Sequence, residues 1–367
     1  MFTTPEIEIW NLTPGVEALA GPQRIFNVVG RLTAPECVVE LSYSLNGSPE
    51  QPVFFSRTAR DCDRLSTVGD FNIDTINFDE LKSQNRFSLR LVMRDNKTIN
   101  YEVDFSIRFW PEGPPKFHLN LKGCDLPEMV GQVVDGKWQI SPDESGMPCL
   151  QIKEADAGYD RIILFGRYNW STGYEIFAKL SLAAWCGKID HGLGIGFKWN
   201  PHLQGDGTCL PSQWNTGIGL YYFPRSLTIK PGLRISIGVD VHVDNQGRYT
   251  GEYILKQGML SFWRWALGNL QRHLFCRPYP IAQIAACRPY FFRLRIVPEA
   301  YRLTIWPSES PEPAPQVVAR QPIDWLPKGA VGIIAHHCAV RVYQFEVVPV
   351  ETTAKEIFHR GPNDAER

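Results

Sequence analysis

The strongest constraint on the fold of this chain is an alternation of apolar and polar residues with a period of two. Four runs in the first part of the sequence show it clearly, at 25–32, 38–45, 87–95 and 100–109. Turn-forming residues, such as Asn46 and Gly47, separate the runs. Because a strand buried on one side places every second residue in the core, we expect an all-β protein of packed sheets.

The first part of the chain has the length and rhythm of one small sandwich. About 100 residues with short strands and regular turns are typical of an immunoglobulin-like β-sandwich, which we expect over residues 1–110. Residues 111–116 then read PEGPPK, in which proline and glycine resist both helix and sheet interior. We interpret this stretch as a short, stiff linker and the first domain as a spacer or docking module.

Strand-like runs continue beyond the linker over residues 117–350. About twelve candidate strands in one antiparallel domain favour a large two-sheet jelly roll over an open sheet. The total length of 367 residues suits two domains. Residues 351–367 are polar, and we expect this tail to fray.

The last part of the chain, from 290 to 350, carries a recognisable pattern. It contains a P-x-G-x-V-G-I strand formed by Pro327, Gly329, Val331, Gly332 and Ile333. Gly329 would permit a turn and Gly332 a close approach to the neighbouring strand. The segment resembles the closing section of concanavalin A-like, laminin-G-type domains. That resemblance implies a jelly-roll sandwich, but its members include carbohydrate-binding modules, hydrolases, lyases and protein-binding domains.

Charge and cysteine content limit the partners and the compartment. Lys and Arg number 38 against 39 Asp and Glu, which argues against nucleic-acid binding because such proteins carry a basic excess. No run approaches the ~20 apolar residues of a spanning helix. The start of the chain lacks signal-peptide features, so we expect a cytoplasmic protein. Nine cysteines without C-x-x-C spacing favour reduced thiols, although Cys37 and Cys62 could pair.

The expected strand 234–244 gives one candidate catalytic site. Asp240, His242 and Asp244 alternate along it, about 7 Å apart on one face. His242 between two carboxylates could act as a general base or bind a metal, and a solvated polar face explains the pattern equally. Laminarinase-like relatives of the resembled fold use a Glu-x-Asp-x-x-Glu run that is absent here, so a retaining two-carboxylate mechanism is not implied.

A second candidate site is a Gly-containing loop with oxygen ligands. Asp190, His202 and Asp206 could hold Ca²⁺ together with backbone carbonyls, because hard cations take oxygen ligands from loops. Calcium is common in lectin-like sandwiches. The spacing is not a dense D-x-D-x-D pattern, and an ordinary loop also explains it.

Aromatic residues on or beside the strands form a third candidate, a ligand-binding surface. It comprises Trp185, Trp199, Trp214, Tyr221 and Tyr222. Their rings could stack on sugars, and they could equally fill a β core. Because Tyr221 and Tyr222 are adjacent on a strand, only one of them can face the core.

Residues 258–289 interrupt the strand pattern. Read as a helix, they place an aromatic and aliphatic stripe opposite arginines. Such an insertion could pack across the sandwich and roof its groove, or dock on a membrane surface or a protein partner.

Three classes of function therefore remain. The leading hypothesis is a carbohydrate-recognising protein that binds a glycan in the groove of the larger sandwich. The main alternative is an enzyme of lyase, hydrolase or cyclase type, acting on a saccharide or a small hydrophobic substrate in the same groove. The third is a protein- or membrane-docking module that uses residues 258–289.

Overall fold

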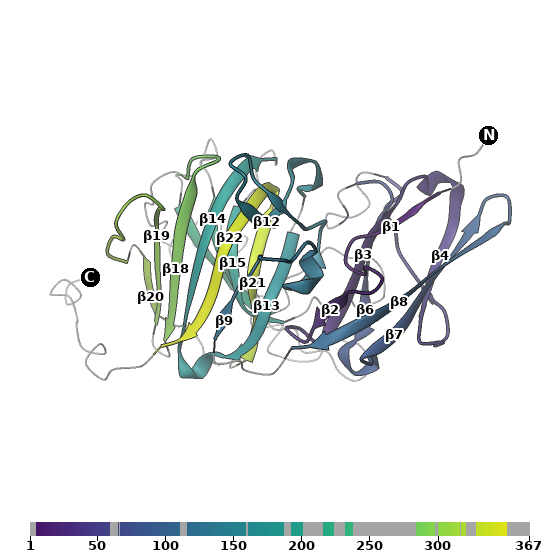
Figure 1. Cartoon of the computed structure of the whole chain (residues 1–367), viewed down its shortest axis with the longest axis horizontal. Helices are drawn as coiled ribbons and strands as arrows, with labels where there is room; N and C mark the ends of the chain where they lie inside the picture. Colours follow the sequence, from purple (N-terminus) through teal and green to yellow (C-terminus); the bar gives the residue numbers. More distant parts are fainter. Residues whose placement is uncertain are drawn as a thin grey trace, which may run out of the picture.

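The computed structural model contains two β-sandwiches arranged along its long axis (Figure 1). The described residues are 5–58, 65, 67–110, 116–158, 161–186, 192–200, 216–223, 232–237, 284–297, 300–315, 317–320 and 328–350. Within these ranges the regular structure consists of β-strands and short 3-10 turns, with no α-helix. The predicted all-β fold class is confirmed.

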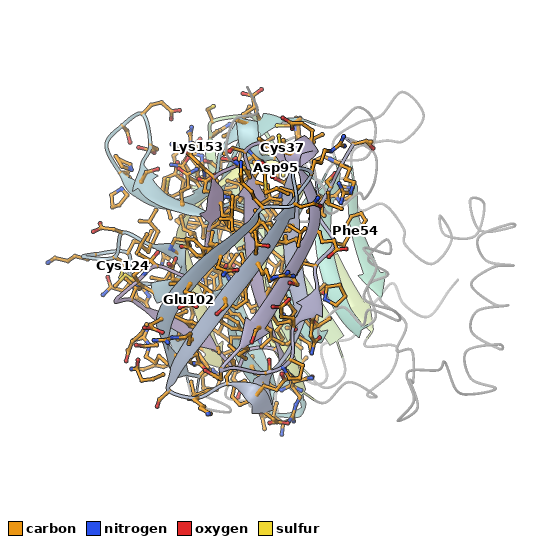
Figure 2. The ribbon with its side chains drawn as sticks, turned by 90° about the vertical axis from the view of Figure 1, so that its right-hand side faces the viewer. Cys37, Phe54, Asp95, Glu102, Cys124 and Lys153 are labelled. Atoms are coloured by element: carbon orange, nitrogen blue, oxygen red, sulfur yellow. The ribbon has the colours of Figure 1, made fainter. Side chains whose placement is uncertain are left out.

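The N-terminal sandwich consists of a five-stranded sheet and a three-stranded sheet. The first has the order β2-β8-β7-β4-β5 and the second β1-β3-β6. The bounds are β1 (Ile7–Ile9), β2 (Glu17–Ala20), β3 (Ile25–Leu32), β4 (Val38–Leu45), β5 (Gln51–Pro52), β6 (Asp70–Asn77), β7 (Gln84–Met93) and β8 (Thr98–Phe109). Phe26 and Phe105 stack between the sheets, with ring centroids 5.9 Å apart. Figure 2 views this sandwich end-on. Its assignment as immunoglobulin-like stays a prediction.

The C-terminal sandwich has a six-stranded sheet, β10-β13-β21-β15-β16-β17, and an eight-stranded sheet. The eight-stranded sheet has the order β11-β12-β22-β14-β18-β19-β20, with β9 paired to β22. The bounds are β9 (Phe117–His118), β10 (Gln132–Asp135), β11 (Gln139–Pro142), β12 (Pro148–Ile152), β13 (Arg161–Asn169), β14 (Tyr174–Trp185), β15 (Gly192–Asn200), β16 (Thr216–Phe223), β17 (Gly232–Ile237), β18 (Pro289–Val297), β19 (Ala300–Pro307), β20 (Val317–Arg320), β21 (Lys328–His336) and β22 (Cys338–Pro349). Every strand pairing described lies within 7–109 or within 117–349.

Alternation along the strands divides core from surface in the way that the sequence predicts. On β18, Phe292, Leu294 and Ile296 are buried in the main core. The residues that alternate with them, Phe291, Arg293 and Arg295, are only half-buried. The core thus uses one face of each sheet and leaves the other face to be covered or exposed.

The two glycines of the P-x-G-x-V-G-I strand behave differently. A Cβ on Gly332 would come 2.0 Å from the carbonyl oxygen of Ile163 on β13, so the close approach expected there is confirmed. The turn expected at Gly329 is wrong. Gly329 lies within β21, pairs with Tyr168, and accepts a hydrogen bond from the Trp170 indole at 3.1 Å.

The three-stranded sheet of the N-terminal sandwich packs against the outside of the six-stranded sheet through buried and partly buried polar contacts. The side-chain oxygen of Gln132 accepts a hydrogen bond from the Gln23 backbone N–H at 3.1 Å, and its side-chain N–H donates to the carbonyl of Ile25 at 2.7 Å. Asn72 donates to the Val134 carbonyl at 2.9 Å and to the Asp135 carboxylate. One outer face of the larger sandwich is therefore covered by the smaller one in this region.

The described cysteines are all free thiols, Cys37 among them, and its candidate partner Cys62 lies outside the described residues. Over the same residues, no helix has both the length and the apolar character needed to cross a bilayer.

Candidate functional site

Many of the predicted site residues lie outside the part of the chain that the structure describes. They are Asp190, His202, Asp206, Trp214, Asp240, His242 and Asp244. Residues 258–283, which make up most of the segment expected to contain a helix, also lie outside the described part of the chain. Among the described residues, no group of three or more His, Cys, Asp or Glu side chains could hold a metal ion. The catalytic, calcium and docking hypotheses thus stay predictions.

Of the predicted aromatic surface, the structure describes Trp185, Trp199 and the strand that carries Tyr221 and Tyr222. Tyr221 and Tyr222 belong to β16, where they pair with Gly194 and Leu193 of β15. Trp185, at the end of β14, is partly buried and packs against the main core.

Trp199 corrects the prediction most clearly. Only 1% of it is exposed, and its indole N–H donates to the side-chain oxygen of Gln23 at 3.0 Å, across the junction of the two sandwiches. The pairing of β15 with β21 shifts register between Gly196 and Trp199. Because the shift reverses the alternation, Phe197 faces the main core whereas Trp199 faces the N-terminal sandwich. Trp199 is therefore a junction residue and cannot offer a ring face to a ligand.

The second outer surface of the larger sandwich belongs to the eight-stranded sheet. Along four adjacent strands, β22, β14, β18 and β19, the residues that alternate with the core form a mixed aromatic and polar surface. We call this surface the outer face. Its members are Glu175, Phe177, Lys179, Ser181, Phe291, Arg293, Arg295, Arg302, Thr304, Trp306, Arg341, Tyr343, Gln344 and Glu346.

Three aromatic rings gather at its centre. Phe177 and Phe291 are stacked, with centroids 5.0 Å apart, and Trp306 lies 5.4 Å from Phe291 and 6.1 Å from Phe177. Trp306 is only 6% exposed, whereas the two phenylalanines are half-buried. The indole thus supports two rings that keep part of their surface accessible.

Arg293 ties this aromatic group to the charges around it. Its guanidinium lies 5.2 Å from the Phe177 ring centroid and 5.8 Å from that of Trp306. It also pairs with Glu312 at 2.6 Å and with Glu175 at 3.4 Å. A guanidinium held by two carboxylates and two rings has little rotational freedom, so the neighbouring rings are held as well.

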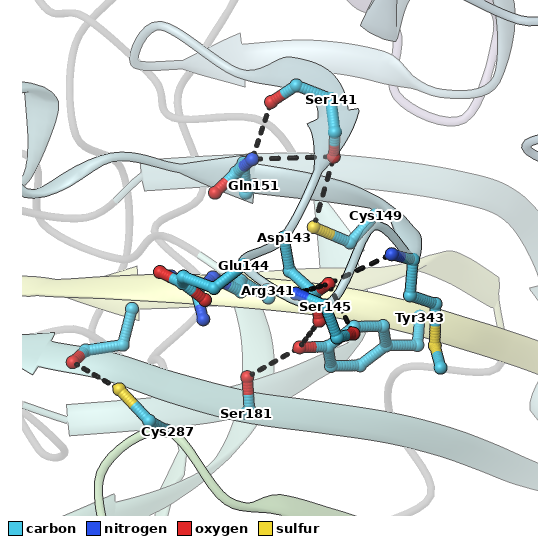
Figure 3. A network of polar contacts seen from close by, with 12 residues as sticks. Ser141, Asp143, Glu144, Ser145, Cys149, Gln151, Ser181, Cys287, Arg341 and Tyr343 are labelled. Carbon is cyan, nitrogen blue, oxygen red and sulfur yellow. Dashed lines mark hydrogen bonds and ion pairs between the residues drawn. The ribbon is translucent and has the colours of Figure 1, made fainter.

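A polar network borders the aromatic group on β22 and β14. Figure 3 shows the Tyr343 hydroxyl between Ser181 and the turn at 143–145. The Tyr343 hydroxyl donates to the Asp143 carboxylate at 3.0 Å and lies 3.2 Å from the Ser181 hydroxyl. The Ser145 hydroxyl donates to Asp143 at 2.7 Å, and the Met147 N–H at 2.9 Å. These bonds, that of Ser145 foremost, lower the pKa of Asp143 to about 2.

The ionisable groups beside this network are suited to binding more than to covalent chemistry. Arg341 is paired with Glu144. Cys149 donates its S–H to the Ser141 carbonyl at 3.3 Å, and burial raises the pKa of its thiol to about 11. At neutral pH this thiol stays protonated, and a protonated thiol is a poor nucleophile.

The outer face was not singled out from the sequence, although its signal is present there. The run YFFRLRIVP places Phe291, Arg293 and Arg295 on one side of a strand, and the run YEIFAKLSL does the same for Phe177 and Lys179. In each run, the alternation of apolar and polar residues shows which side of the strand is polar. That β14 and β18 are neighbours, which brings the two sides together, follows only from the sheet order.

The fold and this surface define the class as an all-β protein of two sandwiches, the larger of which presents a mixed aromatic and polar sheet face. No family model and no curated protein matches the chain. Among solved structures, the Emp47p carbohydrate recognition domain is 10% identical, with a TM-score of 0.38, over 65% of this chain and 96% of that one. The Ca²⁺-bound VIP36 exoplasmic/lumenal domain is also 10% identical, with a TM-score of 0.35, over 58% and 88%.

A third similar structure is a Bacillus subtilis protein of unknown function with a galectin-like fold. It is 14% identical, with a TM-score of 0.32, over 65% of this chain and 98% of that one. At these identities and TM-scores the likeness carries no argument about function, which has to come from the chain's own residues.

Proposed function

We propose that the chain binds a carbohydrate on the outer face of the eight-stranded sheet. The observation that carries this proposal is the pair of half-buried rings, Phe177 and Phe291, held rigidly beside hydrogen-bonding side chains. A pyranose presents apolar C–H faces and a rim of hydroxyls. Its recognition needs flat apolar surface next to donors and acceptors, which is the combination found here.

The surrounding groups supply those donors and acceptors. The hydroxyl of Tyr343 and the amide of Gln344 are neutral partners, and Glu346 and Lys179 are charged ones. Gln344 already donates to Glu346 at 2.6 Å, so part of the set is arranged before a ligand arrives. The opposite face of the sandwich is covered around β13 and β21 by the N-terminal sandwich, which favours the eight-stranded sheet as the binding surface.

A glycan array compared between three proteins tests this function. Phe291→Ala removes an accessible ring from the centre of the outer face, and we expect it to weaken glycan binding at least about tenfold. The matched control is Phe54→Ala, because Phe54 is a similarly accessible phenylalanine, 38% exposed, on the N-terminal sandwich (Figure 2). This control should bind as the wild type does.

Two outcomes would overturn the proposal. One is a wild-type protein that binds no glycan on the array. The other is a Phe291→Ala protein that folds normally by near-ultraviolet circular dichroism and binds as tightly as the wild type. If Phe291→Ala does not fold, Phe177→Leu replaces it, because leucine keeps the apolar volume near the core but removes the flat ring.

A further inference from the structure

On the basis of the proposed function, we infer that residues 308–315 form a strap over part of the outer face, and that release of this strap extends the carbohydrate site to Trp306. The strap lies between β19 and β20 in the chain (Figure 1). The inference goes beyond glycan binding itself, because it gives the site a closed and an open state and names the contacts that choose between them.

The outer face is more deeply buried at β19 than at the strands nearer the centre of the sheet. Phe177 on β14 and Phe291 on β18 are half-buried. Thr304 and Trp306 on β19 point the same way, and they are only 3% and 6% exposed. Side chains on the outward face of an antiparallel sheet are accessible to water unless something lies over them. A cover therefore lies over β19.

An ion pair identifies the strap as part of that cover. Arg293 is the direct cross-strand partner of Thr304, and its guanidinium pairs with Glu312 of the strap at 2.6 Å. The same guanidinium lies 5.8 Å from the ring centroid of Trp306. The carboxylate of Glu312 therefore reaches the outward side of β18 and β19, and the strap that carries it lies beside the buried indole.

The strap is fastened mainly near its first residues. Glu309 pairs with Arg288, and the N–H groups of Ser308 and Ser310 donate to the carbonyls of Pro289 and Pro307 at 3.0 and 2.9 Å. Three of the next five residues, 311–315, are prolines, which have no N–H to donate, and all five are exposed. A segment with few buried apolar contacts opens at low cost, and exposed ion pairs hold only weakly. The strap is thus suited to open and close.

Opening of the strap would add a third ring to the binding surface. The ring centroid of Trp306 lies 5.4 Å from that of Phe291 and 6.1 Å from that of Phe177, so an uncovered indole continues the surface of these two rings. Because only the open form offers this ring, the apparent affinity is reduced by the fraction of molecules that are open. Loss of the two ion pairs raises that fraction.

The accessibility of Trp306 is measured first, without a ligand. Protein labelled with 5-fluorotryptophan carries one fluorine on each of its 11 tryptophans, and the Trp306 resonance is the one absent from Trp306→Phe. The change in this resonance between H2O and D2O reports its exposure, and we expect a larger change in a Glu309→Gln, Glu312→Gln double variant than in the wild type. The matched control is Glu50→Gln, which removes another exposed pair, that with Arg90 on the N-terminal sandwich, and should leave the Trp306 resonance as it is in the wild type.

The affinity for a neutral glycan that the wild type binds on the array is measured next. We expect the double variant to bind it roughly three- to tenfold more tightly than the wild type, from the loss of two surface ion pairs. Raising the NaCl concentration from about 0.05 M to about 0.5 M should tighten binding to the wild type and change the double variant less. If the double variant does not fold, the salt series on the wild type replaces it in both measurements.

The two measurements separate the strap from the proposed function. A folded double variant with an unchanged Trp306 resonance shows that the ion pairs hold no cover over the indole, and the inference fails. A more exposed Trp306 together with unchanged or weaker glycan binding removes the extension of the site, while the proposed function stands. If no glycan binds to any of these proteins, the proposed function is wrong, and the Trp306 resonance alone then decides whether the strap opens.

Discussion

The contact between β13 and β21 allows a sharp test of how closely this sheet is packed. Gly332 on β21 and Gly196 on β15 are directly opposite each other, and neither has a positive φ, so conformational preference does not distinguish them. A Cβ on Gly332 would lie 2.0 Å from the Ile163 carbonyl oxygen and 2.9 Å from the Leu164 Cα, both backbone atoms. A Cβ on Gly196 would meet only the Ile334 side chain, at 2.8 Å from its Cδ1.

These two environments predict different costs for the same substitution. In Gly196→Ala the end of a flexible side chain can move, so we expect a loss of about 1 kcal/mol, the low end for overpacking. In Gly332→Ala backbone must move, and the strands cannot separate without weakening ladder hydrogen bonds worth about 1 kcal/mol each. We therefore expect a loss of at least about 3 kcal/mol, or roughly 6–12 °C in Tm.

Urea unfolding followed by tryptophan fluorescence, with calorimetry for Tm, measures both variants. Equal losses, or a Gly332→Ala protein within about 1 kcal/mol of the wild type, would show that the sheet yields where the structure predicts that it cannot. A Gly332→Ala protein that does not fold beside a folded Gly196→Ala protein supports the same reasoning.

Two further predictions concern buried and partly buried polar groups. Trp199→Phe removes the donor to the Gln23 side-chain oxygen and leaves a buried acceptor unpaired, so we expect a loss of about 1–3 kcal/mol in urea unfolding; a loss below about 0.5 kcal/mol would contradict a dry junction. Asp143 has a folded pKa of about 2 against an ordinary value of 3.8, so its contribution to stability is present above pH 3.8 and is lost as the pH falls through about 2. Unfolding measured between pH 2 and 5 should show a shallower pH dependence in Asp143→Asn than in the wild type, and identical slopes would refute the role of the Ser145 and Tyr343 bonds.

The part of the fold that follows from the sequence is the part encoded locally. Alternation within a run assigns Phe292 and Leu294 to the core and Arg293 to the surface without any tertiary information. The close approach at Gly332 is also readable, because a glycine within an apolar strand indicates a crowded neighbour.

Properties that depend on strand pairing could not be read in the same way. The register shift before Trp199 changes which face the indole occupies, and nothing within the strand's own residues indicates the shift. The meeting of Phe177, Phe291 and Trp306 requires three strands to be neighbours, although β14 and β18 are separated by more than 100 residues. The aromatic residues singled out from the sequence therefore included none of these three rings.

The junction between the sandwiches has a mechanical consequence. Its contacts are directional, since Gln132 and Asn72 each form hydrogen bonds of 2.7–3.1 Å with groups of the opposite sandwich in a buried or partly buried setting. An interface made only of apolar contacts can slide, but rotation at this junction would leave amide groups without hydrogen-bond partners. The junction therefore favours one orientation of the two sandwiches relative to each other. A partner that binds the smaller sandwich would therefore also set the direction in which the outer face of the larger sandwich points.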